Sequence, residues 1–191
     1  MARYSIGIDQ SYSGCAIVHY NAADHSAAEK VYDFSPKLAG SGLARLAHVY
    51  RTLREHFALI EQLGPITHVC YEGYAYGAKF KREEMGELGG ILKLALATQF
   101  PAHVARRIHA VAPPTVKKFV TGSGRADKDK MLLAVYKRWE HEASSHDAAD
   151  AYVLARIAAD LDAETLPELK FQQEVLDTVR GTKKSSPTGT S

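Results

Sequence analysis

Several hallmarks of common protein classes are scarce or missing in this 191-residue chain. The two cysteines, Cys15 and Cys70, both lie in strand-like apolar runs, which argues against a disulfide framework and against a four-ligand zinc site. The longest apolar stretches, such as residues 91–97, fall far short of the roughly 20 residues that cross a bilayer. The N-terminus runs directly into a strand-like segment and lacks the pattern of a signal peptide. We therefore expect a cytoplasmic protein without a membrane partner.

The residues that are present indicate an ordinary globular domain with an uneven charge distribution. Hydrophobic residues make up 46% and charged residues 24% of the chain, a mixture that supports a buried core. The net charge is only +2, but residues 103–138 carry +7 and the remaining residues sum to −5. A basic stretch on an otherwise acidic protein is typical of binding to a phosphate backbone, and a solvated helix face is the alternative interpretation.

The hydrophobic periodicity predicts an α/β fold with a mixed five-stranded sheet, three antiparallel strands followed by two parallel ones, flanked by helices. One fold family with this order is the RNase H-like one. We expect one main domain over residues 1–162, a C-terminal helical extension over 163–180 and a disordered tail over 181–191. Strands are expected at 4–9, 15–20, 29–34, 66–72 and 106–111, and helices at 42–63, 82–99, 113–120, 127–139, from Ser144 or Ser145 to 160, and at 164–179.

Four carboxylates stand at positions that suit a metal site. Asp9 ends the first strand and Glu72 ends the fourth, directly after three residues that look buried. Asp147 and Asp150 are three residues apart, so they share one helix face, and the alanines between them permit close approach to the sheet. Each acid alone has a simpler explanation as a turn residue, an exit to solvent or a helix N-terminal charge. Together they supply the oxygen ligands that Mg²⁺ or Mn²⁺ prefers, and paired metals can hydrolyse a phosphodiester.

With these residues in place, the chain resembles the RuvC-like Holliday-junction resolvases over roughly residues 6–158. The segments that carry the resemblance are Ile6-Gly7-Ile8-Asp9, Tyr71-Glu72, residues 116–128 and Asp147-Ala148-Ala149-Asp150-Ala151, of which residues 116–128 are the most specific. The chain departs from the bacterial pattern in Gln10, where proline is usual, and in a first hairpin about two residues shorter. These differences favour a divergent branch, such as a phage-encoded one.

The resemblance implies a homodimeric enzyme that resolves four-way junctions in a bacterial cell or a phage-infected host. It implies that Asp9, Glu72, Asp147 and Asp150 hold two Mg²⁺ ions, with Mn²⁺ as a substitute, and that Lys128, like Lys117, lies near the scissile phosphate. The apolar helix at 82–99 is the candidate dimer interface, with packing inside the domain as the alternative. Two other functions remain open: a less selective nuclease of flaps, Y-forms and forks, and a non-catalytic protein that binds junctions.

Further DNA contacts are expected from the basic stretch and from a loop after the fourth strand. This loop alternates aromatic and small residues before a basic run, a composition that suits stacking on unpaired bases with phosphate contacts nearby. His146 could assist the acids or could simply be a surface residue. The DNA-binding candidates are Lys117, Lys118, Arg125, Lys128, Lys130, Tyr74, Tyr76, Lys79, Lys81 and Arg82.

Overall fold

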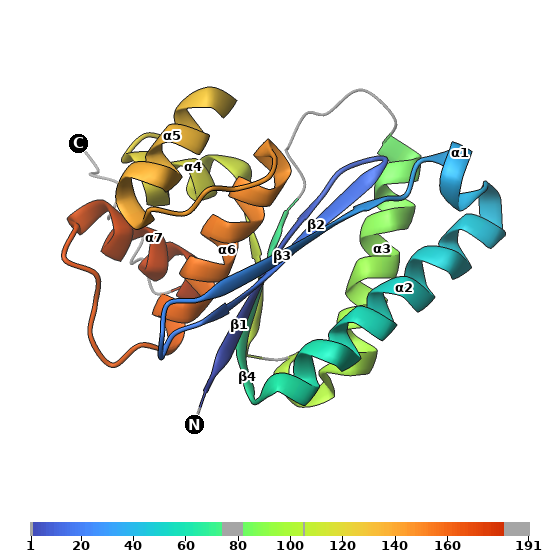
Figure 1. Ribbon diagram of the computed structural model, residues 1–191, viewed down its shortest axis with the longest axis horizontal. Coiled ribbons are helices and arrows are strands. Elements are labelled where there is room, and N and C mark those ends of the chain that lie inside the picture. Colours follow the sequence, from blue (N-terminus) through green and yellow to red (C-terminus); the bar gives the residue numbers. More distant parts are fainter. Residues whose placement is uncertain (1, 74–81, 105, 182–191) are drawn as a thin grey trace, which may run out of the picture.

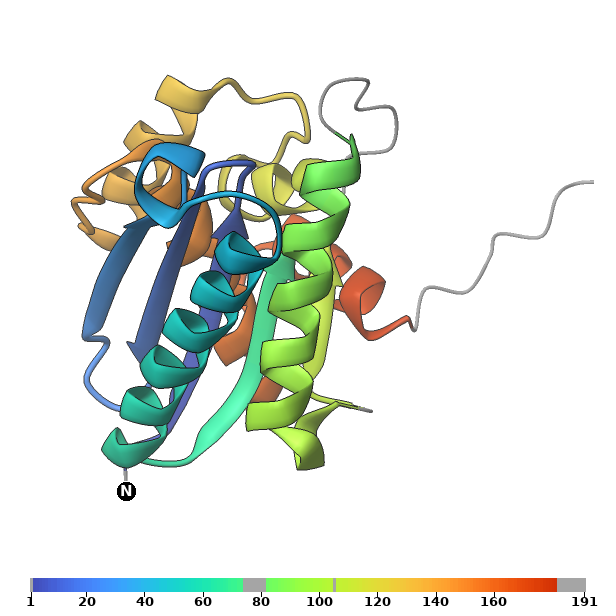
Figure 2. The same cartoon turned by 90° about the vertical axis from the view of Figure 1, so that its right-hand side faces the viewer.

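A five-stranded sheet runs through the middle of the molecule and carries helices on both faces (Figure 1). The computed structural model describes residues 2–73, 82–104 and 106–181. Helices α2 and α3 lie side by side across one face, as Figure 2 shows, whereas α4 to α7 cover the other. The strands are β1 (Tyr4–Gln10), β2 (Gly14–Asn21), β3 (Ala27–Asp33), β4 (Ile66–Glu72) and β5 (Ile108–Val111). The helices are α1 (Pro36–Ala39), α2 (Gly42–Leu63), α3 (Arg82–Gln99), α4 (Pro113–Thr121), α5 (Lys128–Trp139), α6 (His146–Asp162) and α7 (Lys170–Arg180), with a 3₁₀ turn, η1, at Pro101–His103.

The order of the strands in the sheet is β3-β2-β1-β4-β5. The pairs β1–β2 and β2–β3 are antiparallel, whereas β1–β4 and β4–β5 are parallel, which confirms the mixed sheet expected from the sequence. In the parallel pair β1–β4, Ile8 lies opposite Tyr71. The carboxyl ends of β1 and β4 therefore meet at the same edge of the sheet.

Several predicted element boundaries differ from the structure; β3, for example, begins at Ala27 rather than Glu29. β5 begins at Ile108 rather than Arg106, because the amides of Arg106 and Arg107 donate to the His103 carbonyl and close a turn before the strand. α7 begins at Lys170 rather than Glu164. Pro167 has no amide hydrogen and disfavours helix for the residue before it, so a helix that runs through residues 164–166 is disfavoured.

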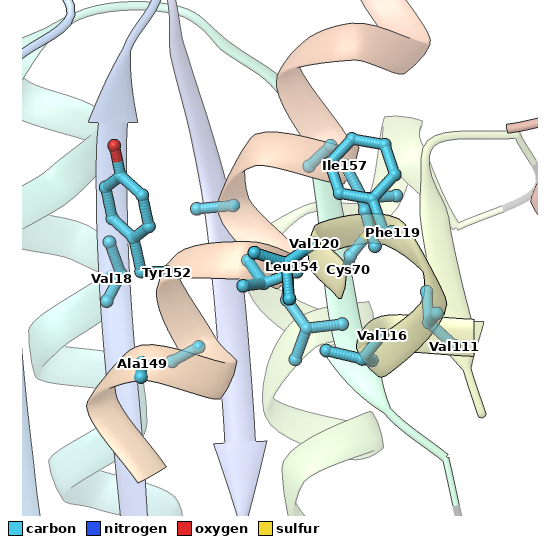
Figure 3. Close-up of a cluster of buried hydrophobic side chains, with 14 of the residues drawn as sticks. Val18, Cys70, Val111, Val116, Phe119, Val120, Ala149, Tyr152, Leu154 and Ile157 are labelled. Carbon is cyan, nitrogen blue, oxygen red and sulfur yellow. The ribbon is translucent and has the colours of Figure 1, made fainter. Parts of the chain in front are cut away.

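Each face of the sheet has its own hydrophobic core. On one face, α6 packs against β1, β2 and β4, and its buried side chains meet those of α4 (Figure 3). On the other face, α2 and α3 cover Ile6, Ile8 and Val69. Because side chains alternate along a strand, Gly7 and Asp9 face α6 while Ile8 and Gln10 face the α3 side. Among the described residues, no helix is long and apolar enough to span a membrane.

Buried Arg45 of α2 ties together two loops at the edge of the sheet where β1 ends. Its Nε donates to the Phe34 carbonyl at 2.8 Å and its Nη2 donates to the Tyr12 carbonyl at 2.5 Å. The guanidinium also lies over the Tyr12 ring, 5.0 Å from its centroid. The loop that follows Asp9 is therefore anchored to the segment after β3.

We expect Arg45→Met to lower the free energy of unfolding by about 3 kcal/mol, because two carbonyls, one in a buried and one in a partly buried hydrogen bond, lose a charged donor. Urea denaturation measures this change. The matched control is Arg51→Met on the exposed side of the same helix, which should change stability by less than about 0.5 kcal/mol. Equal effects of the two variants would show that the contacts of Arg45 do not matter.

Candidate active site

Two carboxyl groups meet where β1 and β4 end. Asp9 is 7% exposed, and its carboxyl is hydrogen-bonded to that of Glu72. Burial raises the pKa of Asp9 most, followed by the charge of Glu72 and the hydrogen bond to it. Burial also raises the pKa of Glu72, whereas the hydrogen bond from Asp9 acts to lower it. Because the same hydrogen bond raises the pKa of Asp9 and lowers that of Glu72, Asp9 is the donor and Glu72 the acceptor.

Helix α6 adds the two other acids. The Ser145 hydroxyl accepts a hydrogen bond from the Ala148 amide at 3.1 Å and caps the helix, so Asp147 lies in its first turn and Asp150 in the next. The charges of both aspartates raise the pKa of Asp9, which means that both lie within electrostatic reach of the sheet edge. The four predicted acids, which come from three separate parts of the sequence, are brought together in space.

The approach of α6 to the sheet depends on a glycine that the sequence analysis did not select. A Cβ on Gly7 of β1 would lie 2.0 Å from the Ala151 carbonyl oxygen and 2.2 Å from the Ala155 amide nitrogen. The Ser5 hydroxyl donates to the Ala155 carbonyl at 2.8 Å and adds a second link. A glycine between two buried isoleucines, paired with an alanine-rich helix, was the available signal for this contact.

Burial and repulsion among the acids also raise the pKa of Asp150, to about 6. Burial is the largest cause, followed by the charge of Glu72. Lys117 of α4 and Lys128 of α5 act in the opposite direction, since their charges lower the pKa of both Glu72 and Asp150. The structure thus places the two lysines of the predicted set beside the acids.

Two of the remaining DNA-binding candidates form ion pairs with other parts of the chain. Lys118 points to α7, where its Nζ lies 2.6 Å from the Glu174 carboxylate, and Lys130 pairs with Asp127 at 2.8 Å. Arg125 is exposed in the α4–α5 loop. Arg82 is the first residue of α3. Tyr74, Tyr76, Lys79 and Lys81 lie outside the described residues.

His146 links the beginnings of two helices. Its Nε2 lies 3.3 Å from the Asp129 carboxylate, which joins the first turn of α6 to the first turn of α5. Asp129 follows Lys128, and Asp147 follows His146. The contact therefore links the helix that begins with the candidate catalytic Lys128 to the helix that carries two of the acids.

The carboxyl groups fit a divalent cation by their chemistry. They supply hard oxygen ligands, and a cation would relieve the repulsion that raises three of their pKa values. Asp150 Oδ1 is buried, and no hydrogen-bond donor of the described residues reaches it. Within 2–73, 82–104 and 106–181, however, no group of three or more His, Cys, Asp or Glu side chains is arranged to hold a metal ion as it stands. The acids form a cluster rather than a finished coordination cage.

Comparison with solved structures identifies the fold of this chain. The RuvC structure from Thermus thermophilus matches with a TM-score of 0.59 and 20% identity over 80% of this chain and 90% of that one. This protein has the RNase H-like fold of RuvC. A T. thermophilus RuvC bound to a Holliday junction substrate matches equally, with a TM-score of 0.59 and 21% identity over the same shares of the two chains.

Other comparisons add little to this RuvC-like fold. The yeast mitochondrial Holliday junction resolvase Ydc2 gives a TM-score of 0.48 and 16% identity over 93% of this chain and 82% of that one. No family model and no curated protein matches the sequence.

The raised pKa of Asp150 predicts a pH-dependent effect on stability. A carboxyl whose pKa is raised by folding contributes stability below its unfolded value near 3.8, and this contribution is lost as the pH rises through about 6. Without divalent metal, Asp150→Asn should therefore raise the melting temperature relative to the wild type at about pH 8, and the gain should shrink toward about pH 4. Thermal unfolding in EDTA at both pH values measures it, and a gain that does not depend on pH would contradict it.

Proposed function

We propose that the protein is a structure-selective DNA endonuclease that resolves four-way junctions by nicking two symmetric strands. The observation that supports this proposal is the cluster of four buried or half-buried acids with Lys117 and Lys128 beside it, at one edge of a RuvC-like sheet. The T. thermophilus RuvC of the same fold was solved with a Holliday junction substrate, which supports a junction as the DNA to test first.

The residues of this chain take distinct roles in hydrolysis. Asp9, Glu72, Asp147 and Asp150 would hold two Mg²⁺ ions, with Mn²⁺ as a substitute. When bound, this pair supplies an activated water and stabilises the charge of the phosphodiester as it is cleaved. The charges of Lys117 and Lys128 lower the pKa of Glu72 and of Asp150, which favours the ionised carboxylates that bind cations. Lys128 is also exposed, so its ammonium group can reach the extra negative charge that develops on the phosphate.

Two symmetric nicks require two active sites, so the proposal includes a homodimer. A two-fold dimer presents identical sites to the two opposing strands of a junction. We place its interface on α3, where Leu94 is 53% exposed and a Cβ on Gly90 would meet no atom within 4 Å.

The test of the dimer is Leu94→Arg on α3. We expect the variant to behave as a monomer in light scattering and to produce unpaired nicks, because an arginine in an apolar interface leaves a buried charge. Leu59→Arg, on an exposed position of α2, is the control and should keep the mass of the wild type. A dimer of unchanged mass in the α3 variant would rule out this interface.

The test of the function is incubation of an end-labelled four-way junction with the purified chain, with and without Mg²⁺. Paired nicks at symmetric positions, dependent on the metal, are the expected result. Flaps, Y-forms and replication forks at matched salt form the comparison set, because phosphate binding depends strongly on salt. Equal cleavage of all branched substrates would favour the less selective nuclease, and binding without any cleavage would favour a non-catalytic junction protein.

A further inference from the structure

A small pocket opens beside Glu72 on the α3 side of the sheet edge, and the catalytic proposal does not use it. Its volume is about 90 Å³. One water requires about 10 to 15 Å³ of such space, so the pocket has room for a group larger than a single water. It is lined by Gln10, Ser11, Tyr71, Glu72, Gly73, Met85, Gly89, Leu92, Lys93 and Pro113.

The lining combines apolar walls with a few polar groups. Tyr71, Met85 and Leu92 supply flat or adaptable apolar surface, on which an aromatic ring can stack. Gln10 contributes an amide that both donates and accepts hydrogen bonds, and Lys93 contributes a donor with a positive charge. A single nucleobase has this combination of flat apolar faces and a polar edge.

The pocket and the acid cluster lie on opposite faces of one sheet edge. Side chains alternate along β1 and β4, so Asp9 points toward α6 while its neighbour Gln10 lines the pocket. Glu72 belongs to both, since it contacts Asp9 and also lines the pocket. A DNA strand that crosses this edge with a phosphate at the acids would bring the adjacent base to the pocket.

We propose that this pocket binds one base of the cleaved strand, next to the scissile phosphate, and that Gln10 and Lys93 determine which base is accepted. The inference rests on the proposed nuclease function and adds a sequence preference to it. Gln10 reads the base edge through its amide, and Tyr71 contributes apolar surface under the base. Lys93 donates to an acceptor on the same edge.

The experiment uses the full-length protein and four-way junctions with a randomised core. Nick positions in the presence of Mg²⁺ are determined by sequencing, which gives the base preference at each position around the cut. A well-placed amide or lysine contact discriminates between bases by roughly 5- to 150-fold, so the wild type should show a preference of this size at one position. Gln10→Ala and Lys93→Met should each reduce it to about twofold or less, since the contact is lost.

Two further variants separate base reading from a general effect on the fold. Gln10→Glu replaces the amide by an acceptor and should shift the preference toward cytosine, whose amino group can donate to it. Lys170→Met on α7 is the matched control and should keep the wild-type preference. Thermal unfolding identifies any variant that does not fold. Because Gln10 and Lys93 are tested independently, the test remains valid if one of the two variants does not fold.

The possible failures are distinguishable. A wild type that nicks junctions without any base preference, or variants that retain the wild-type preference, would overturn the pocket assignment and leave the nuclease function intact. A wild type that cleaves no DNA with Mg²⁺ would overturn the proposed function and, with it, the assignment of a base to this pocket.

Discussion

Asp150→Asn is expected to reduce Mg²⁺-dependent cleavage of a four-way junction by more than about a hundredfold, since even the outer-shell partners of metal ligands cost 10- to 100-fold when removed. The asparagine keeps the size of the side chain but removes one negative charge from the cluster. Asp150 Oδ1 is buried and has no hydrogen-bond donor from the described residues, so the variant should fold normally. Its effect should therefore fall on cation binding.

The same variant should bind junction DNA at least as tightly as the wild type. Carboxylates near a phosphate weaken binding by charge repulsion unless a cation lies between them. Gel-shift titration in EDTA and cleavage in Mg²⁺ measure the two properties separately. Loss of both binding and cleavage would indicate a folding or docking defect instead of a catalytic one.

Asp160 provides a matched control on the same helix. It lies ten residues further along α6, its pKa is also raised by burial, and its charged neighbour is Arg156 rather than the acid cluster. Asp160→Asn should cleave junctions at the rate of the wild type after correction for the folded fraction. If it lost activity as Asp150→Asn does, the general stability of α6 would explain both results.

Much of this fold could be predicted because its strands and helices differ clearly in their apolar patterns. The short apolar runs of β1, β2 and β4 and the helical spacing of apolar residues in α2 and α3 set the element types. The helix α2 between β3 and β4 predicts a crossover and hence a parallel direction for β4, and the observed pairing of β4 with β1 brings Asp9 beside Glu72. The direction of β4 was therefore accessible from the sequence pattern, whereas its place beside β1 is a tertiary feature.

Other parts of the site depend on side-chain packing that no periodicity encodes. Lys117 and Lys118 are adjacent in the sequence, yet Lys117 faces the acids while Lys118 pairs with Glu174 of α7. Adjacent residues on a helix point in directions about 100° apart, so which lysine faces the site depends on how α4 is rotated. That rotation is set by burial of Phe119 and Val120 against α6 and α7, a tertiary constraint. The pocket beside Glu72 also arises only when α3 packs against the sheet edge.

A second large effect is expected from Gly7→Ala, which adds one methyl group where β1 touches α6. The new Cβ would lie 2.0 Å from the Ala151 carbonyl oxygen and 2.2 Å from the Ala155 amide nitrogen. Both are backbone atoms, so no change of rotamer can relieve the clash and the helix must move. Overpacking of this kind costs typically 1 to 3 kcal/mol and sometimes more, and we expect a loss of about 3 kcal/mol in the free energy of unfolding.

The displacement of α6 should damage cleavage beyond its effect on stability. Asp147 and Asp150 move with the helix, whereas Asp9 and Glu72 stay with the sheet, and a misplacement of about 1 Å can cost roughly a hundredfold in rate. Cleavage per folded molecule, measured under conditions where the variant is at least half folded by circular dichroism, should fall by about that factor. Ser5→Ala is the control, because it removes the hydrogen bond to the Ala155 carbonyl without adding bulk and should cost only about 1 kcal/mol with little loss of rate. Wild-type cleavage per folded Gly7→Ala molecule would mean that the four acids act without the close contact between β1 and α6.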